Sequence, residues 1–252
     1  MVLQHITNKQ KEIILLLYRF RFLNRIQIQT LLHNKDHKNI NNWLKDLTTK
    51  NYIARTYDKT HQKNTTPGIF FVSANGFKYL KFQDGVDLIL LKKLRQEKRR
   101  SERFIEKSIL VADIYLKLLS EESLKNRDFK FYSQQDFPGK GLIRELHPDF
   151  AYVYRVDKEL EHFVGEVFSD KMPRYLIKSR VNKFMEYFGD DDGKPTNIIF
   201  ICKDEFILSL VRKYIYRIIR DEGEANANFY TATTNEIHEK GMAVMNKSSV
   251  II

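Results

Sequence analysis

Two acidic residues, Asp149 and Glu166, have the types and spacing expected of a metal site that acts on phosphate esters. Asp149 follows Pro148 at the start of a strand-like run, and Glu166 lies seventeen residues later in a second one. Two carboxylates on one face can hold Mg²⁺, which activates water and stabilises the charge that develops on a phosphate during cleavage. Phe168 points to the same side of its strand as Glu166 and can neither coordinate a metal nor stabilise charge.

Whether the two acids meet depends on the connection between their strands. A two-residue turn at Asp157-Lys158 would place Asp149 opposite Glu166, whereas a loop of residues 157–160 would place Asp149 opposite Phe168 and diagonal to Glu166. The Asp-Lys pair lacks the glycine that tight hairpin turns prefer, so the four-residue loop is favoured. A structural alternative stays open, because a carboxylate on an apolar face could simply pair with an arginine or lysine of a neighbouring helix.

The sequence of the second part of the chain predicts the helices and strands that would position these acids. Apolar periodicity indicates the order α-β-β-β-α-β-α-β, which implies an α/β domain with a mixed sheet. The predicted helices and strands span residues 101–119, 128–137, 148–156, 162–168, 172–188, 197–203, 205–223 and 228–234.

The net charge of +11 is distributed unevenly along the 252 residues. Residues 1–100 hold 20 lysines and arginines against 7 acids, whereas the remaining residues hold 23 against 25. Such an asymmetry indicates a module that binds a polyanion, and we expect this polyanion to be double-stranded DNA. The sequence has no apolar run of bilayer length, no signal peptide and a single cysteine, so we expect a cytoplasmic protein without a membrane partner or a disulfide framework.

The basic part has the pattern of a winged helix-turn-helix domain, with helices predicted at 8–23, 25–33 and 37–50. Thr7 or Asn8 could cap the first helix, and Asp36 could cap the third. The third helix has an apolar stripe of Ile40, Trp43, Leu44 and Leu47. Its polar face could contact base edges and phosphates as a recognition helix, through Lys38, Asn39, Asn41, Asn42 and Lys45. A merely solvated polar face is the alternative.

A β-hairpin at residues 51–58 and 68–73 follows, as the wing of such a domain would. Its polar tip carries Lys59, His61 and Lys63, which we expect against phosphate or in the minor groove. Residues 86–103 read as a basic helical linker that extends the DNA-binding surface with Lys98, Arg99 and Arg100. We therefore predict a chain of the α+β class in three parts: a winged helix-turn-helix domain (1–85), the linker (86–103) and an α/β domain (104–252).

These motifs together resemble one known family over roughly residues 5–235. The helix "IEKSILVADIYLKL", the strands "PDFAYVY…FVGEV" and the helix "YLIKSRVNKFMEYF", behind a winged helix, are similar to the plasmid replication-relaxation family. The resemblance implies a degenerate PD-(D/E)-x-K, restriction-endonuclease-like domain in a DNA-binding protein of mobile elements. The wider superfamily has a lysine, and this family tends to have an acid, where this chain has Phe168. Some superfamily members move the lysine to the next helix, where Lys178 and Lys183 lie.

The main expectation is a DNA-binding protein that acts in plasmid replication, relaxation or conjugative transfer and whose nuclease-like domain is inactive. Its partners would be duplex DNA, other replication or transfer proteins and a second copy in a homodimer. Two alternatives stay open: a Mg²⁺-dependent nicking or cleaving nuclease with Asp149 and Glu166 as catalytic and metal-binding residues, and a transcriptional regulator.

Overall fold

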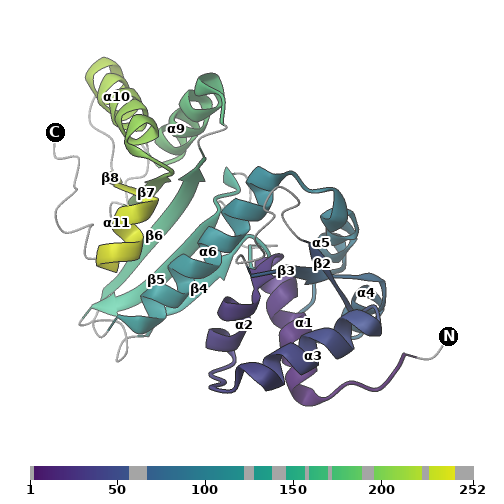
Figure 1. The fold of residues 1–252 in the computed structure, drawn as a ribbon. Coiled ribbons are helices and arrows are strands. Elements are labelled where there is room, and N and C mark those ends of the chain that lie inside the picture. Colours follow the sequence, from purple (N-terminus) through teal and green to yellow (C-terminus); the bar gives the residue numbers. More distant parts are fainter. Residues whose placement is uncertain are drawn as a thin grey trace. The chain divides into compact units, whose positions relative to one another are not determined.

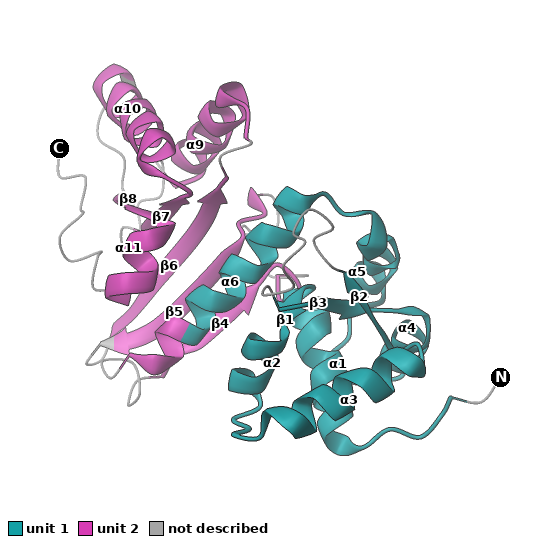
Figure 2. Cartoon of the chain, viewed as in Figure 1, with its two compact units in different colours: residues 1–116 teal, residues 117–252 magenta. Residues whose placement is uncertain are grey.

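The computed structural model describes residues 3–56, 67–121, 128–137, 146–156, 159–169, 172–188, 196–222 and 227–241. The chain divides into two compact units, Met1–Leu116 and Lys117–Ile252 (Figure 2). The division falls within helix α6 (Glu102–Ser120), so that residues 86–103 all lie in the first unit.

The first unit begins with three short helices in the predicted order. They are α1 (Asn8–Phe20), α2 (Arg25–Leu31) and α3 (His37–Thr49). Each start is capped by a polar side chain that accepts a backbone hydrogen bond: Thr7 from Gln10, Asn24 from Gln27 and Asp36 from Lys38. Such caps satisfy backbone donors that a helix start would otherwise leave unpaired, and they explain why each helix begins where it does.

A three-stranded antiparallel sheet of order β1-β3-β2 completes this helical core. Strands β2 (Ile53–Thr56) and β3 (Ile69–Val72) form the predicted hairpin, with Ile53 paired to Val72. The edge strand β1 (Leu23–Asn24) was not predicted, because two residues are too few to show a pattern.

The segment predicted as a linker contains two short helices after α4 (Ala74–Leu80), namely α5 (Leu88–Lys93) and the 3₁₀ helix η1 (Leu94–Arg99). Leu91, Leu94 and Glu97 of these helices are buried. Glu97 forms an ion pair with Arg21. The guanidinium carbon of Arg21 also lies over the Phe104 ring, 4.3 Å from its centroid. Burial raises the pKa of the Glu97 carboxyl, an effect that Arg21 and Arg100 oppose in part. These contacts anchor the segment on the first unit.

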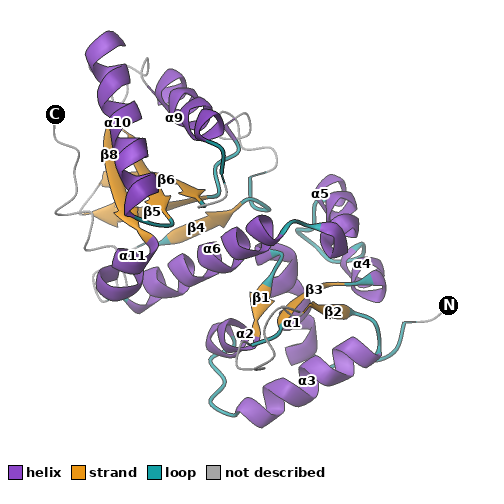
Figure 3. Ribbon diagram, turned by 45° about the horizontal axis from the view of Figure 1, so that its top comes forward, coloured by secondary structure: helices purple, strands orange, loops and turns teal. Residues whose placement is uncertain are grey.

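The second unit is built on a five-stranded mixed sheet, which confirms the predicted α+β class (Figures 1 and 3). The sheet order is β4-β5-β6-β7-β8, antiparallel from β4 to β6 and parallel from β6 to β8. The elements are β4 (Lys130–Ser133), β5 (Phe150–Val156), β6 (Glu159–Phe168), α9 (Arg174–Phe188), β7 (Thr196–Cys202), α10 (Glu205–Glu222), β8 (Ala227–Thr233) and α11 (Thr234–Lys240). Helix α11, which Thr233 caps, was not predicted.

Helices α9 and α10 cover one face of this sheet and form its main core with β6 and β7 (Figure 1). The rings of Phe168, Phe184 and Phe200 meet there. Aromatic side chains of β5 and β6 form a separate row. In this row Tyr152 stacks on Phe163 with ring centroids 4.6 Å apart. Gly165 lies opposite Phe150 in this row, where an added Cβ atom would meet the Phe150 ring at 2.0 Å, so glycine is required.

Candidate functional site

The pairing of β5 with β6 decides where the two predicted acids lie. Val156 pairs with Glu159 and Phe150 pairs with Gly165, so one step further along the same register places Asp149 opposite Glu166. This register corresponds to the two-residue connection, and the favoured four-residue loop was wrong because Glu159 and Leu160 belong to the strand. The cross-strand stack of Tyr152 on Phe163 explains the outcome, since a shift by two residues would separate these rings.

Asp149 is 3% exposed, and both oxygens of its carboxylate accept hydrogen bonds from protein groups. One oxygen, Oδ2, accepts a hydrogen bond from the backbone N–H of Val167 at 2.8 Å, and Oδ1 accepts one from Gln134 Nε2 at 3.0 Å. Its own backbone N–H donates to the Gly165 carbonyl at 3.0 Å. Asp149 thus extends the β5–β6 ladder just before Phe150, the first paired residue of β5, and its side chain satisfies a backbone donor of β6.

Glu166 is 2% exposed and is held by Arg180 from helix α9. Arg180 donates from Nη2 to Oε2 at 2.6 Å and from Nε to Oε1 at 3.2 Å, which is a two-point contact between guanidinium and carboxylate. The same guanidinium donates to the carbonyls of Leu146 and His147 at 2.9 and 3.3 Å. Burial lowers the pKa of Arg180, but the charges of Glu166 and Asp149 outweigh it and raise this pKa overall.

This arrangement does not fit the Mg²⁺ that the nuclease alternative requires. Each oxygen of Asp149 and Glu166 already accepts a hydrogen bond from a protein donor, and the donor facing Glu166 is a cation. Mg²⁺ requires a near-octahedral set of oxygen ligands and usually keeps several waters. Among the described residues, no group of three or more histidines, cysteines or acids could hold a metal ion. The residues present therefore favour an internal ion pair over a metal centre.

Phe168, at the position of the expected lysine, is completely buried and packs against Phe200 with ring centroids 5.5 Å apart. The two lysines considered as replacements, Lys178 and Lys183, have exposed side chains on α9. Arg180, which sequence reasoning left unnamed as a partner of Glu166, lies three residues after Ile177 and four before Phe184, both buried. That spacing places it at the edge of the buried stripe and could have identified it.

The predicted recognition helix has the expected two faces. Ile40, Leu44 and Leu47 of α3 are buried, while Trp43 is only half-buried, so its assignment to the core was too strong. All five polar residues are exposed, namely Lys38, Asn39, Asn41, Asn42 and Lys45. One side of the helix is thus available to a partner.

The remaining residues predicted to contact DNA belong to the hairpin tip and to the basic segment 86–103. Lys59, His61 and Lys63 lie outside the described residues. Lys98 and Arg99 are exposed on η1. Arg100 is half-buried, with Nε 3.5 Å from Glu97 Oε1 and its guanidinium over the Phe104 ring at 4.9 Å. Arg100 therefore has a structural role that Lys98 and Arg99 do not share.

Comparison with family models supports the resemblance seen in the motifs. The model of the replication-relaxation family matches residues 15–199, which is most of the chain. The chain belongs to this family. The match spans both compact units of this replication-relaxation protein, from α1 to β7. Curated protein sequences contain no significant match.

One solved structure found to be similar is the restriction endonuclease FokI, with a TM-score of 0.30 and 11% identity. The alignment covers 96% of this chain and 47% of that FokI chain, so this protein spans about half of its length. A TM-score this low is no evidence of a shared fold or activity.

In the described part of the chain, no helix has the length and apolar character needed to cross a bilayer.

Proposed function

We propose that this protein binds duplex DNA through α3 and the β2–β3 wing and acts in the replication, relaxation or transfer of a plasmid or similar element. The observation that carries the proposal is the exposed Asn/Lys face of α3, opposite a buried apolar stripe. Asparagine can pair with an adenine edge and lysine with guanine or phosphate in the major groove. Membership of the replication-relaxation family supports a role in replication.

The charge distribution supports the same assignment. The excess of lysine and arginine lies in residues 1–100, and these residues contain α3 and both wing strands. Phosphate contacts provide most of the affinity for DNA and make it dependent on salt. Lys98 and Arg99, both exposed, would add backbone contacts to those of α3.

We further propose that the second unit does not cleave DNA and serves as a scaffold for dimerisation, partner docking or a second DNA contact. Arg180 supplies the charge that neutralises Glu166, and the Asp149 carboxylate is bound by Gln134 and the Val167 backbone. The buried ring of Phe168 replaces the lysine that would assist the chemistry. A lost active site whose acids have been retained for structure would have these contacts.

The binding proposal is tested by fluorescence anisotropy with a labelled DNA duplex. The double variant Lys38→Ala/Lys45→Ala should weaken binding by about tenfold or more and lower its salt dependence, because two phosphate or base contacts are lost. Lys9→Ala, at an exposed position of α1, is the matched control and should bind as the wild type does. Unchanged affinity in the double variant would remove α3 from the DNA interface.

A metal-dependent nuclease remains the second candidate, because the register does place Asp149 directly opposite Glu166. Supercoiled plasmid should be incubated with the protein and Mg²⁺ or Mn²⁺, and in parallel with a chelator. The scaffold assignment expects no nicking in any of these reactions. Nicking that requires metal and disappears in folded Asp149→Asn or Glu166→Gln variants would establish the nuclease instead.

A further inference from the structure

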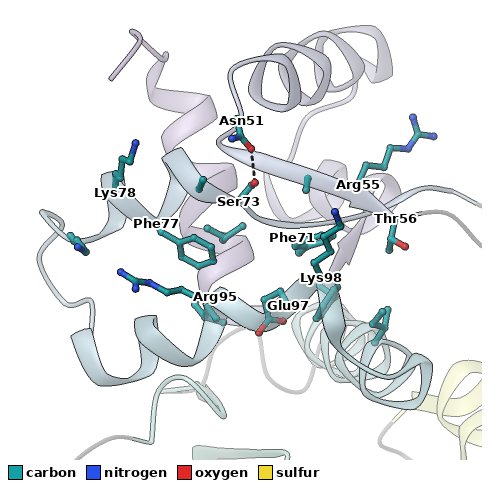
Figure 4. A pocket seen from close by; sticks show the side chains of 17 residues that line it. Asn51, Arg55, Thr56, Phe71, Ser73, Phe77, Lys78, Arg95, Glu97 and Lys98 are labelled. Atoms are coloured by element: carbon teal, nitrogen blue, oxygen red, sulfur yellow. Dashed lines mark hydrogen bonds between the residues drawn. The ribbon is translucent and has the colours of Figure 1, made fainter. Parts of the chain in front are cut away.

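A groove on the first unit combines an apolar floor with a basic rim and is separate from the proposed recognition helix. Its main hollow has a volume of about 970 Å³ and lies between β2, β3, α4 and η1 (Figure 4). Phe71, Phe77 and Leu94 contribute to the floor. No exposed Asn/Lys residue of α3 lines it. The volume is within the range of binding pockets for small molecules and short peptide segments.

A second hollow of about 340 Å³ continues the groove along α5. The two hollows share Phe77, Lys81 and Arg95, which makes them neighbours. Large apolar side chains are exposed at or beside this end: Phe82 is 81% exposed, Ile89 67% and Leu88 55%. Phe82 and Leu88 line the second hollow. Exposed apolar side chains grouped beside a groove are typical of an interaction surface.

The rim of the groove is strongly basic. Its exposed cations are Arg55 on β2 and, on α4, α5 and η1, the residues Lys78, Lys81, Lys92, Arg95 and Lys98. In Figure 4 the side chains of Phe77, Lys78 and Arg95 lie on the same side of the hollow. Among the described residues, the only acid in either lining is Glu97, which is buried and paired with Arg21. Of the acids just before α5, Asp87 caps that helix by accepting from the backbone of Ile89 and Leu90, and Asp84 is exposed.

From this combination we propose that the groove is a docking site for an acidic amphipathic helix of a partner protein. The apolar face of such a helix would cover Phe77, Phe82 and Leu88. Its acidic flanks would meet the rim cations other than Lys98, which is assigned to the DNA contact. The exposed aliphatic side chains favour a protein over single-stranded DNA, because bases stack on aromatic rings and gain little from leucine or isoleucine. The partner would thereby be brought to the same unit that is proposed to bind duplex DNA.

The test uses the full chain and a synthetic probe. The probe is a fluorescein-labelled amphipathic peptide of about 18 residues, with leucine at helical spacing and glutamate on both flanks. Its matched control has lysine in place of every glutamate. The acidic peptide should bind with a Kd of about 10 µM or tighter, and the basic peptide should bind at least about tenfold more weakly. Equal binding of the two peptides, or no binding of the acidic one, would overturn the proposal.

Variants of the groove locate the binding. Lys81→Glu/Arg95→Glu should raise the Kd for the acidic peptide by about tenfold or more, and Phe82→Ser should raise it by several-fold. Lys9→Glu and Tyr175→Ser change an exposed charge and an exposed ring elsewhere and should have no effect. Loss of peptide binding in these controls, or its retention in the groove variants, would contradict the assignment.

Two further measurements separate this proposal from the proposed function. Lys38→Ala/Lys45→Ala should lose duplex affinity and keep peptide affinity, so the two proposals can fail independently. A labelled single-stranded oligonucleotide should not compete with the acidic peptide. Competition that disappears in Lys81→Glu/Arg95→Glu would show that the groove binds nucleic acid, and the peptide proposal would be wrong.

Discussion

Arg180 of helix α9 holds the carboxylate of Glu166 of strand β6 through two hydrogen bonds of 2.6 and 3.2 Å. The Glu166 side chain is almost completely buried, and the Arg180 side chain is about four-fifths buried. The pair joins a helix to the centre of the mixed sheet and, through the carbonyls of Leu146 and His147, to the segment that leads into β5. A cation thus stands beside Glu166 where a catalytic site would need a metal.

The first prediction concerns this pair. Arg180→Met should lower the free energy of unfolding by about 3–5 kcal/mol, because it leaves a buried carboxylate without a counter-charge. Chemical denaturation followed by circular dichroism measures the change. Arg217→Ala, at an exposed position of α10, is the control and should change the stability by less than about 0.5 kcal/mol.

The double variant Glu166→Gln/Arg180→Met should recover part of this loss, because no buried charge then lacks a partner. A double variant as unstable as Arg180→Met alone would show that the ion pair has no special role and that packing around Arg180 explains the effect.

Introducing the lysine of an active nuclease should fail at this site. Phe168→Lys places an ammonium group at a completely buried position against Phe200 and should destabilise the fold by several kcal/mol. Phe168→Leu keeps an apolar side chain and should cost about 1 kcal/mol. A Phe168→Lys protein as stable as the wild type, or one that nicks plasmid with Mg²⁺, would contradict the assignment of Phe168 to the core.

Two residues of α3 should have separable effects on DNA recognition. With a duplex selected from a randomised pool, Lys45→Ala should reduce the slope of log affinity against log salt by about one, as expected for a lost phosphate contact. Asn42→Ala should leave the slope unchanged and reduce discrimination between selected and unselected duplexes by about 1–3 kcal/mol. Binding titrations at several salt concentrations measure both; equal effects on slope and discrimination would contradict this division.

Cys202 should be unreactive in the folded protein. Burial in β7 raises the pKa of its thiol far above the ordinary value, and the Arg212 guanidinium offsets only part of this. Because the raised pKa keeps the thiol protonated at mildly alkaline pH, a chromogenic disulfide reagent should label the native chain only as fast as it unfolds. The same reagent should react at once in concentrated guanidinium chloride. Rapid labelling under native conditions would show that β7 is accessible.

Local sequence patterns predicted most of the elements, because the signals of helices and strands lie within a few residues. The cap at Asp36 and the stripe of Ile40, Leu44 and Leu47 predicted α3, and apolar runs predicted the strands of the second unit. The motifs also identified the replication-relaxation family, which the family model confirms.

The elements that were missed are short. β1 has two residues and exists only because β3 lies beside it, and α11 has seven residues directly after a strand. Neither is long enough for hydrophobic periodicity to appear. Trp43 was assigned to the core because its spacing fits the stripe, but a side chain of that size at the edge of the stripe stays half-exposed.

The sequence by itself determined which side chains could do chemistry: the two acids, the phenylalanine that follows the second, and the Asn/Lys face of a helix. Only the tertiary structure decided what those acids do. The Asp149–Glu166 pairing depends on strand register, which the cross-strand stack of Tyr152 on Phe163 specifies. The partner of Glu166 is an arginine on another element, brought to the acid by the packing of α9 on the sheet, and a buried carboxylate is stable only beside such a partner.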